Sequence, residues 1–430
     1  EVYYGRFSAT TVAQAKAQVD KTLEYEQFLM PDPSFLNNAI LIAGVDSEFA
    51  PKHGNGQINY ASSTYFNSTN GIKPSIYLYP ESGKSATKII QNVNAGSCFV
   101  NYTAHGSPTG WADPAFSKTK VPALTNAHKY PLMVGNCCLT NKFEQGECFG
   151  EALLRAENKG AIGYIGASNS STWDEDYWFG VGYRSSIVLN PKYSATQLGC
   201  YDRLFHTNGE AFGEWYTTQG QIMNAGNLAV TQSGTSSITY YWEIYHLMGD
   251  PSLMPYFSVP LKMPVSYTSP SPVSTTTISI KTEPYAYAAV SLNGVLYGVA
   301  LADATGKAEV KLSKLFSADC VADVVVTKQN RQPYSGKLVI DNSTGISDII
   351  SNNILTIFPN PSYDVFTLSG LEKGNRIELF DVTGKLIFET VSENTSLVID
   401  LKEQQKGIYF YKVSDPSSKK LVTGKLLLLE

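Results

Sequence analysis

The sequence predicts an α/β domain with a mostly parallel sheet flanked by helices, followed by two small all-β sandwiches. Its 430 residues are too many for one ordinary hydrophobic core. Over residues 1–258, short apolar runs alternate with helix-like segments, whereas residues 259–341 and 350–430 consist mainly of strand-like segments with period-two alternation. The Pro- and Ser-rich segment VSYTSPSPVSTTT, residues 265–277, marks the transition between the first two domains.

The first domain is predicted from apolar runs without polar alternation, which is the pattern of parallel strands buried on both faces by helices. The predicted strands are VYYGRF (2–7), AILIAGV (39–45), CFVNYTA (98–104), PLMVGN (131–136) and AIGYIGAS (161–168). The predicted helices include TVAQAKAQVDKTLEYEQFL (11–29) and CFGEALLRAENKG (148–160).

The two β domains are predicted from strands joined by tight turns. Asn293-Gly294 stands between two apolar strands and predicts a hairpin, and a second turn is expected from Asp303 to Gly306. The length of residues 259–341 fits an immunoglobulin-like sandwich. Turns at Gly384 and Gly407 indicate a second small sandwich over residues 350–430.

Charge and hydropathy exclude two classes of partner. The formal net charge is -5 and no Lys/Arg block is present, so the sequence predicts neither nucleic-acid binding nor attraction to an anionic membrane. No apolar run approaches the roughly 20 residues of a transmembrane segment. The first residue is not Met and no signal peptide follows, which predicts a processed product or a fragment that begins inside a domain.

Two predicted parallel strands end in residues suited to nucleophilic catalysis. His105-Gly106 follows residues 98–104, and Cys137-Cys138 follows residues 131–136. Because the carboxyl ends of neighbouring parallel strands share one edge of the sheet, His105 and Cys138 are expected to meet. An imidazole can stabilise a thiolate and later protonate a leaving amine, while the Gly106 and Cys138 amides can hold an oxyanion.

The alternative is a loop histidine beside two small buried cysteines. The six cysteines have no CxxC pair and no regular spacing, which argues against a disulfide framework or a zinc knuckle. The combination of both strand ends favours catalysis over that alternative.

The motifs NYTAHGSPTGWADP (101–114), GNCCLTNKF (135–143) and WEIYHLMGDPSLMPY (242–256) resemble the catalytic region of the gingipains, caspase-like cysteine peptidases. This resemblance implies Cys138 as nucleophile, His105 as general base and Asp46, in LIAGVDSEF, as the carboxylate that orients the imidazole. For Asp46 the alternative is an ordinary turn aspartate. The resemblance also implies that a subdomain upstream of residue 1 is missing.

The lysine-specific branch of the gingipains is most similar, because Trp173-Asp174-Glu175-Asp176 matches its W-x-E-D segment. The resemblance implies that Asp176 pairs with a substrate ammonium and that Thr103, Asn136 and Trp173 line the same pocket. The alternative is a solvated acidic loop. Thr172 departs from the aromatic residue of that branch, so cleavage after Lys is expected first and after Arg second.

The last domain resembles the C-terminal sorting domain of type IX secretion, through FPNP (358–361), DVTGK (381–385) and KGIYFYKV (406–413). This implies a secreted or surface-bound protein that contacts the outer-membrane type IX secretion machinery. Gingipains bind calcium, which makes structural calcium an expectation, although no EF-hand pattern identifies ligands and the metal site stays unknown. The chemistry itself requires no cofactor.

The function expected is hydrolysis of peptide bonds in protein or peptide substrates after a basic residue. The first rival is an inactive gingipain homologue that acts as a surface adhesin, since two β-sandwiches alone suit binding. The second rival is a peptidase that cuts after Asp. The carboxylates of Asp174, Glu175 and Asp176 argue against this second rival, because an aspartate pocket needs arginines.

Overall fold

The structure, a computed structural model, describes residues 2–341, 355–415 and 421–429. The chain divides into two compact units, Glu1–Ile340 and Asp341–Glu430. The first unit contains both the predicted α/β domain and the predicted immunoglobulin-like sandwich. The predicted boundaries at residues 258 and 350 stay predictions, and residue 350 lies outside the described residues.

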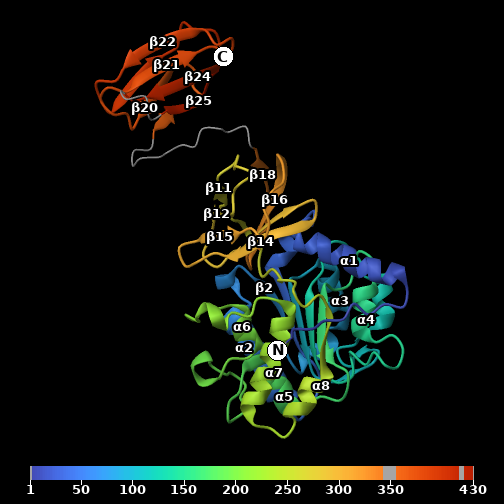
Figure 1. Ribbon diagram of the computed structural model, residues 1–430. Helices are drawn as coiled ribbons and strands as arrows, with labels where there is room; N and C mark the ends of the chain where they lie inside the picture. The colour runs from blue at the N-terminus through green and yellow to red at the C-terminus, as the bar shows by residue number, and fades with distance from the viewer. Residues whose placement is uncertain (1, 342–354, 416–420, 430) are drawn as a thin grey trace. The chain divides into compact units, whose positions relative to one another are not determined.

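A six-stranded sheet forms the centre of the first unit (Figure 1). Its strand order is β2-β1-β3-β7-β8-β9, in which the first five strands are parallel and β9 is antiparallel to β8. The strands are β1 (Asn38–Ala43), β2 (Lys73–Tyr77), β3 (Phe99–Thr103), β7 (Leu132–Asn136), β8 (Gly163–Ala167) and β9 (Tyr245–Gly249). The predicted α/β class with a mostly parallel sheet is confirmed.

Helices cover both faces of this sheet (Figure 1). They are α1 (Val12–Glu26), α2 (Asn55–Tyr60), α3 (Ala86–Ala95), α4 (Phe149–Arg155), α5 (Trp173–Val181), α6 (Cys200–Leu204), α7 (Gln219–Ser233) and α8 (Ile238–Ile244). Two π-helical turns flank α2, namely η2 (Ala50–Gly54) and η3 (Ala61–Tyr65). The 3-10 turns are η1 (Pro33–Asn37), η4 (Ser68–Asn70), η5 (Glu81–Lys84), η6 (Lys118–Ala123), η7 (Tyr193–Ala195) and η8 (Phe212–Glu214). Among the described residues, no helix combines the length and apolarity needed to cross a membrane.

Alternate residues of each strand supply two separate cores, as the period-two geometry of a strand requires. In β1, Ala39, Leu41 and Ala43 face the core shared with α2, α5, α6 and α7. Ile40 and Ile42 face the opposite core, which is shared with α3 and α4. The apolar runs therefore show no polar alternation because both faces are buried.

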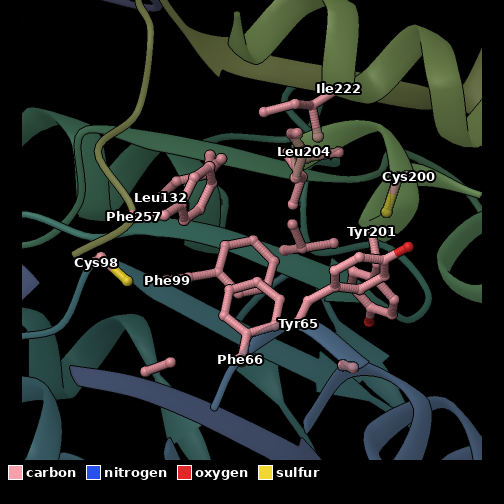
Figure 2. Close-up of a cluster of buried hydrophobic side chains, with 14 of the residues drawn as sticks. Tyr65, Phe66, Cys98, Phe99, Leu132, Cys200, Tyr201, Leu204, Ile222 and Phe257 are labelled. Carbon is pink, nitrogen blue, oxygen red and sulfur yellow. The ribbon is translucent and has the colours of Figure 1, made fainter. Parts of the chain in front are cut away.

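Aromatic rings in the first of these cores fix the position of β3 (Figure 2). Phe99 of β3 stacks on Phe66, with ring centroids 4.6 Å apart. Tyr201 and Phe257 meet this pair edge-on from two other parts of the chain. The residues that follow β3 are thus held at a defined edge of the sheet.

One predicted strand is wrong. Residues 2–7 form no strand and make only an isolated bridge between Arg6 and Met248 of β9. The large apolar side chains of this segment are exposed, unlike those of a buried strand. They are Val2, Tyr3, Tyr4 and Phe7. Their β propensity alone does not bury them, because strand formation depends on a partner edge and a core face.

A small antiparallel sheet and a sandwich complete the first unit. The small sheet joins β4 (Gly106–Ser107), β5 (Gly110–Trp111) and β6 (Phe116–Ser117). The sandwich contains β10 (Leu261–Lys262), β11 (Ser266–Tyr267), β12 (Thr277–Lys281), β13 (Tyr287–Leu292), β14 (Val295–Leu301), β15 (Lys307–Lys311), β16 (Cys320–Thr327), β17 (Arg331–Gln332) and β18 (Tyr334–Ile340). Asn293 and Gly294 both have positive φ between β13 and β14, so the predicted hairpin is confirmed.

The second unit is a two-sheet sandwich with its own core. Its strands are β19 (Thr356–Phe358), β20 (Val365–Ser369), β21 (Arg376–Phe380), β22 (Leu386–Val391), β23 (Ser396–Asp400), β24 (Gly407–Ser414) and β25 (Leu421–Leu428). The predicted turn at Gly384 is present, with φ of 83° and its amide donating to the Asp381 carbonyl oxygen at 3.0 Å. The prediction of two all-β sandwiches is confirmed.

Candidate active site

The candidate catalytic residues follow two neighbouring parallel strands. Thr103, the last residue of β3, lies opposite Asn136, the last residue of β7. His105 and Cys138 each come two residues after this aligned pair. The shared register places both strand ends at one edge of the sheet, where the sequence predicted that His105 and Cys138 meet.

Gly106 brings the two strand ends into direct contact. A Cβ atom on Gly106 would lie 2.5 Å from the Cys138 carbonyl oxygen and 2.7 Å from the Cys137 sulfur. Both distances are shorter than a side chain tolerates, so only glycine allows this approach. The His105-Gly106 segment is therefore packed against the two cysteines.

His105 is oriented by Asp46, which follows β1. His105 Nε2 lies 2.8 Å from Asp46 Oδ2, and Asp46 Oδ1 accepts hydrogen bonds from the Phe49 and Glu48 amides at 2.7 and 2.8 Å. Partial burial acts to raise the pKa of Asp46, but the hydrogen bonds from Phe49 and His105 outweigh it and lower this pKa. An ionised Asp46 holds the proton on Nε2, which leaves Nδ1 free to accept a proton.

The two cysteines differ in environment. Cys137 is fully buried, and this burial raises the pKa of its thiol well above the usual value. Cys138 is partly exposed, and its thiol donates to the Ser171 carbonyl oxygen at 3.6 Å. Reactive thiols are accessible, whereas a desolvated thiol stays protonated and inert. The surroundings thus agree with the choice of Cys138 over Cys137.

Asp176 lies in the first turn of α5 and is 4% exposed. Its Oδ1 accepts from the Tyr241 and Tyr245 hydroxyls at 3.0 and 2.5 Å, and its Oδ2 accepts from the Ser171 hydroxyl at 2.7 Å. Burial raises the pKa of Asp176 to about 6, against the opposing effect of these three hydrogen bonds. The predicted alternative of a solvated acidic loop is wrong for Asp176, because burial is nearly complete.

The other predicted pocket residues occupy different positions around this carboxylate. Thr103 and Asn136 are buried at the strand ends, and the Tyr245 hydroxyl oxygen lies 3.4 Å from Asn136 Oδ1. The Asn136 Nδ2 atom is buried without a hydrogen-bond partner among the described residues. Trp173 stands at the start of α5, edge-on to His105 with ring centroids 5.6 Å apart. The Tyr245 hydroxyl is therefore within hydrogen-bond distance of both Asn136 and Asp176, and its one proton serves the closer Asp176.

Sequence reasoning missed three residues, namely Ser171, Tyr241 and Tyr245. Ser171 contacts Cys138 through its carbonyl oxygen and Asp176 through its hydroxyl, so it joins the thiol to the buried carboxylate. Tyr241 and Tyr245 are four residues apart, a spacing that signals a shared helical face. That signal was present, but only the tertiary structure brings α8, with Tyr241, and the start of β9, with Tyr245, to Asp176.

No group of three or more His, Cys, Asp or Glu side chains suited to a metal ion occurs within the described parts of the chain. The expectation of structural calcium therefore stays a prediction without named ligands.

Comparison with known proteins identifies two families in one chain. A family model described as peptidase family C25 matches residues 1–256, and a secretion system C-terminal sorting domain matches residues 356–427. Lys-gingipain of Porphyromonas gingivalis is 41% identical over 340 residues, covering 77% of this chain and 19% of the relative. Gingipain R1 of the same organism is 26% identical over 389 residues, covering 88% of this chain and 35% of the relative.

Solved structures support the same fold. A protease structure with 37% identity superposes with a TM-score of 0.72, covering 78% of this chain and 74% of that chain. The Arg-specific cysteine proteinase gingipain R superposes with a TM-score of 0.67 at 23% identity, covering 79% of this chain and 75% of that chain. This second likeness shows the fold.

The chain spans about a fifth of the length of the Lys-gingipain that it matches. The sorting domain and the gingipain relatives show that it is a secreted or cell-surface protein. Because the peptidase model covers residues 1–256 of 430, and Lys-gingipain shares 41% identity over 77% of the chain, this protein belongs to peptidase family C25, the gingipain-type cysteine peptidases.

Proposed function

We propose that this chain is a cysteine endopeptidase that hydrolyses peptide bonds after lysine in preference to arginine. One observation carries the proposal: Ser171 connects an accessible thiol, Cys138, to a buried carboxylate, Asp176. The proposed nucleophile and the proposed anionic recognition group therefore both contact the same residue, Ser171. Membership of the gingipain-type family and the 41% identity to Lys-gingipain support the same activity.

In the proposed first step, His105 Nδ1 takes the Cys138 thiol proton and the sulfur attacks the carbonyl carbon before the scissile bond. Asp46 stabilises the imidazolium through its 2.8 Å contact with Nε2. The imidazolium then gives its proton to the leaving amine, and a thioester to Cys138 remains. Water, deprotonated by His105, hydrolyses this thioester and regenerates the thiol.

The negative charge on the tetrahedral oxygen needs backbone donors. We assign this role to the amides of Gly106 and Cys138. The Cys138 N–H donates to no other group of the described residues, as such a donor requires before substrate binds. Loss of one donor of this kind typically costs a factor of about 10² to 10³ in rate.

Gly106→Ala is expected to lower kcat/KM by about a hundredfold or more, because even small misplacement at a reacting centre is costly. The added methyl group would meet the Cys138 carbonyl oxygen at 2.5 Å and force the strand ends apart. Gly213→Ala is the matched control, since nothing lies within 4 Å of a Cβ at that position. Peptide hydrolysis measures the effect, and equal rates for the two variants would show that the close approach is dispensable.

Lysine specificity is assigned to Asp176. A carboxylate oxygen can accept two hydrogen bonds, and Oδ2 accepts only one from within the described residues, from Ser171. A substrate ammonium at Oδ2 would form a charge-assisted hydrogen bond in a buried site. Thr103 lies at the neighbouring strand end, and the Trp173 ring offers an apolar surface for the lysine stem.

The experiment that tests this function is cleavage of fluorogenic peptides ending in Lys, Arg or Asp, under reducing conditions, with and without calcium. Lys peptides should be cut fastest. Cleavage after Asp would contradict the assignment of Asp176 as the group that recognises the substrate lysine. If no peptide is cut by the 430-residue chain or by a longer form, an inactive homologue that acts as a surface adhesin becomes the better explanation.

The pH dependence of lysine cleavage follows from Asp176, whose pKa burial raises to about 6. Below this pH the carboxyl is protonated and neutral, and above it the carboxylate can pair with the ammonium. The kcat/KM for Lys peptides, which reports the free enzyme, should therefore rise through pH 6. In Asp176→Asn this step should be absent. A step that survives in the variant would belong to another group.

We further propose that residues 350–430 are recognised by the outer-membrane type IX secretion machinery, as the match to a sorting domain supports. Structural calcium, without assigned ligands, is proposed as a stabiliser. The calcium arms of the peptide assay test it.

A further inference from the structure

The segment from Asp46 to His53 contacts the start of α5 at several points. Asp46 holds the catalytic His105 at 2.8 Å. Phe49 stacks on Trp173, with ring centroids 5.6 Å apart and an interplanar angle of 11°. Trp173 in turn meets the His105 ring edge-on at 5.6 Å. The indole is thus held between Phe49 and the catalytic imidazole.

His53 supplies a polar contact to the same turn of α5. Its Nε2 lies 2.7 Å from Asp174 Oδ1, and its ring meets Phe49, Trp173 and Tyr177 edge-on. The His53 side chain is 13% exposed, whereas Asp174 is 54% exposed. His53 is therefore an inward-facing group that reaches out to a surface carboxylate.

The two nitrogens of His53 have different surroundings. Nδ1 is buried and has no hydrogen-bond partner among the described residues, so it is best placed as the unprotonated nitrogen. Nε2–H then donates to Asp174, and the ring orientation is determined by that single hydrogen bond and by aromatic packing. Breaking the bond would leave the His53 ring and the adjacent Trp173 without a polar anchor.

We propose that the His53–Asp174 pair is a positioning clasp that holds the Trp173 indole in place as the wall of the lysine pocket. This inference rests on the proposed function, because the pocket assignment gives the wall its substrate. Neither His53 nor Asp174 touches the reacting atoms in this scheme. Both act through Trp173, the residue next to Asp174 in sequence and packed beside His53.

A purely structural role is the competing explanation. A hydrogen bond to a carboxylate that is half exposed, as Asp174 is, contributes little to folding. If the clasp served folding alone, its loss would leave substrate affinity unchanged. A positioning role instead predicts a change in KM, because the lysine stem loses an ordered surface while Cys138 and His105 keep their geometry.

The test compares His53→Phe, which keeps an aromatic ring but loses the donor, with His53→Gln, which keeps an N–H near the Nε2 position. His128→Phe is the matched control, because His128 makes a similar 2.6 Å contact with Glu24 through Nδ1. We expect KM for a Lys peptide to rise about fivefold to tenfold in His53→Phe, with kcat within twofold. His53→Gln should recover at least half of the loss, and the control should match the wild type.

Hydrogen exchange of residues 173–181 is the second readout, and it needs no activity. Exchange should accelerate in His53→Phe and not in His128→Phe. An unchanged KM overturns the proposal, whether or not exchange accelerates. If neither the 430-residue chain nor a longer form cuts any peptide, the proposed function is refuted separately. In that case unchanged exchange in α5 would overturn the clasp, and faster exchange in His53→Phe would support it.

Discussion

Cys138→Ala is expected to reduce kcat/KM for Lys peptides by at least about 10³-fold, because removal of a nucleophile abolishes the covalent pathway. Cys137→Ala is the matched control one residue away. Cys137 is fully buried and burial raises the pKa of its thiol well above the usual value, so it is not available as a thiolate. This variant should keep activity within about tenfold, the loss arising from altered packing beside Gly106.

The measurement is steady-state hydrolysis together with labelling of the active thiol by a peptide chloromethyl ketone that ends in Lys. The label should be found on the peptide that contains Cys138, and it should be lost only in Cys138→Ala. Thermal unfolding of both variants checks that the fold is intact. Labelling at Cys137 would reverse the assignment of the nucleophile.

Asp176→Asn is expected to have the second largest effect, a loss of about 30- to 150-fold in kcat/KM for Lys peptides. A charge-assisted hydrogen bond is worth roughly 2–3 kcal/mol, and about 1.4 kcal/mol corresponds to each factor of ten. The variant keeps the shape of the side chain and one acceptor oxygen for the tyrosine hydroxyls. The Lys-to-Arg preference should fall as well, since a neutral amide no longer favours a compact ammonium.

Glu175→Gln is the matched control for this variant. Glu175 is also buried and accepts hydrogen bonds from the Thr172 and Thr235 hydroxyls at 2.6 and 2.7 Å, so it is a satisfied carboxylate next to Asp176 in sequence. Burial acts to raise the pKa of Glu175, but the hydrogen bonds from these hydroxyls outweigh it, so this pKa is lowered. Lysine cleavage should be nearly unchanged in Glu175→Gln. Equal losses in both variants would mean that acidity of the turn as a whole, not Asp176, selects lysine.

Much of the fold was predictable because it depends on patterns that are local in sequence. Uninterrupted apolar runs predicted strands that are buried on both faces, and β1 with Ile40 in one core and Leu41 in the other confirms this. Asn293-Gly294 predicted its hairpin for the same reason, since positive φ at both residues is a local preference. The strand predicted at residues 2–7 was wrong, because a buried strand needs a neighbouring strand to pair with, and the local pattern does not specify one.

The candidate site divides in the same way. His105 and Cys138 were found from the sequence because each stands just after a recognisable strand, and parallel pairing brings such positions together. The roles of Asp46 and Asp176 were predicted only from the resemblance to gingipains, because nothing in their local sequence distinguishes them from ordinary acidic turn residues.

The sequence by itself determined the class of fold, the order of the domains and the residue types available for thiol chemistry. Only the tertiary structure decided that Ser171 joins Cys138 to Asp176, that Tyr241 and Tyr245 satisfy this carboxylate, and that His53 reaches Asp174. These contacts link segments up to 121 residues apart. Side-chain hydrogen bonds act over about 3 Å, so they exist only after sheet register and helix packing have brought distant parts of the chain together.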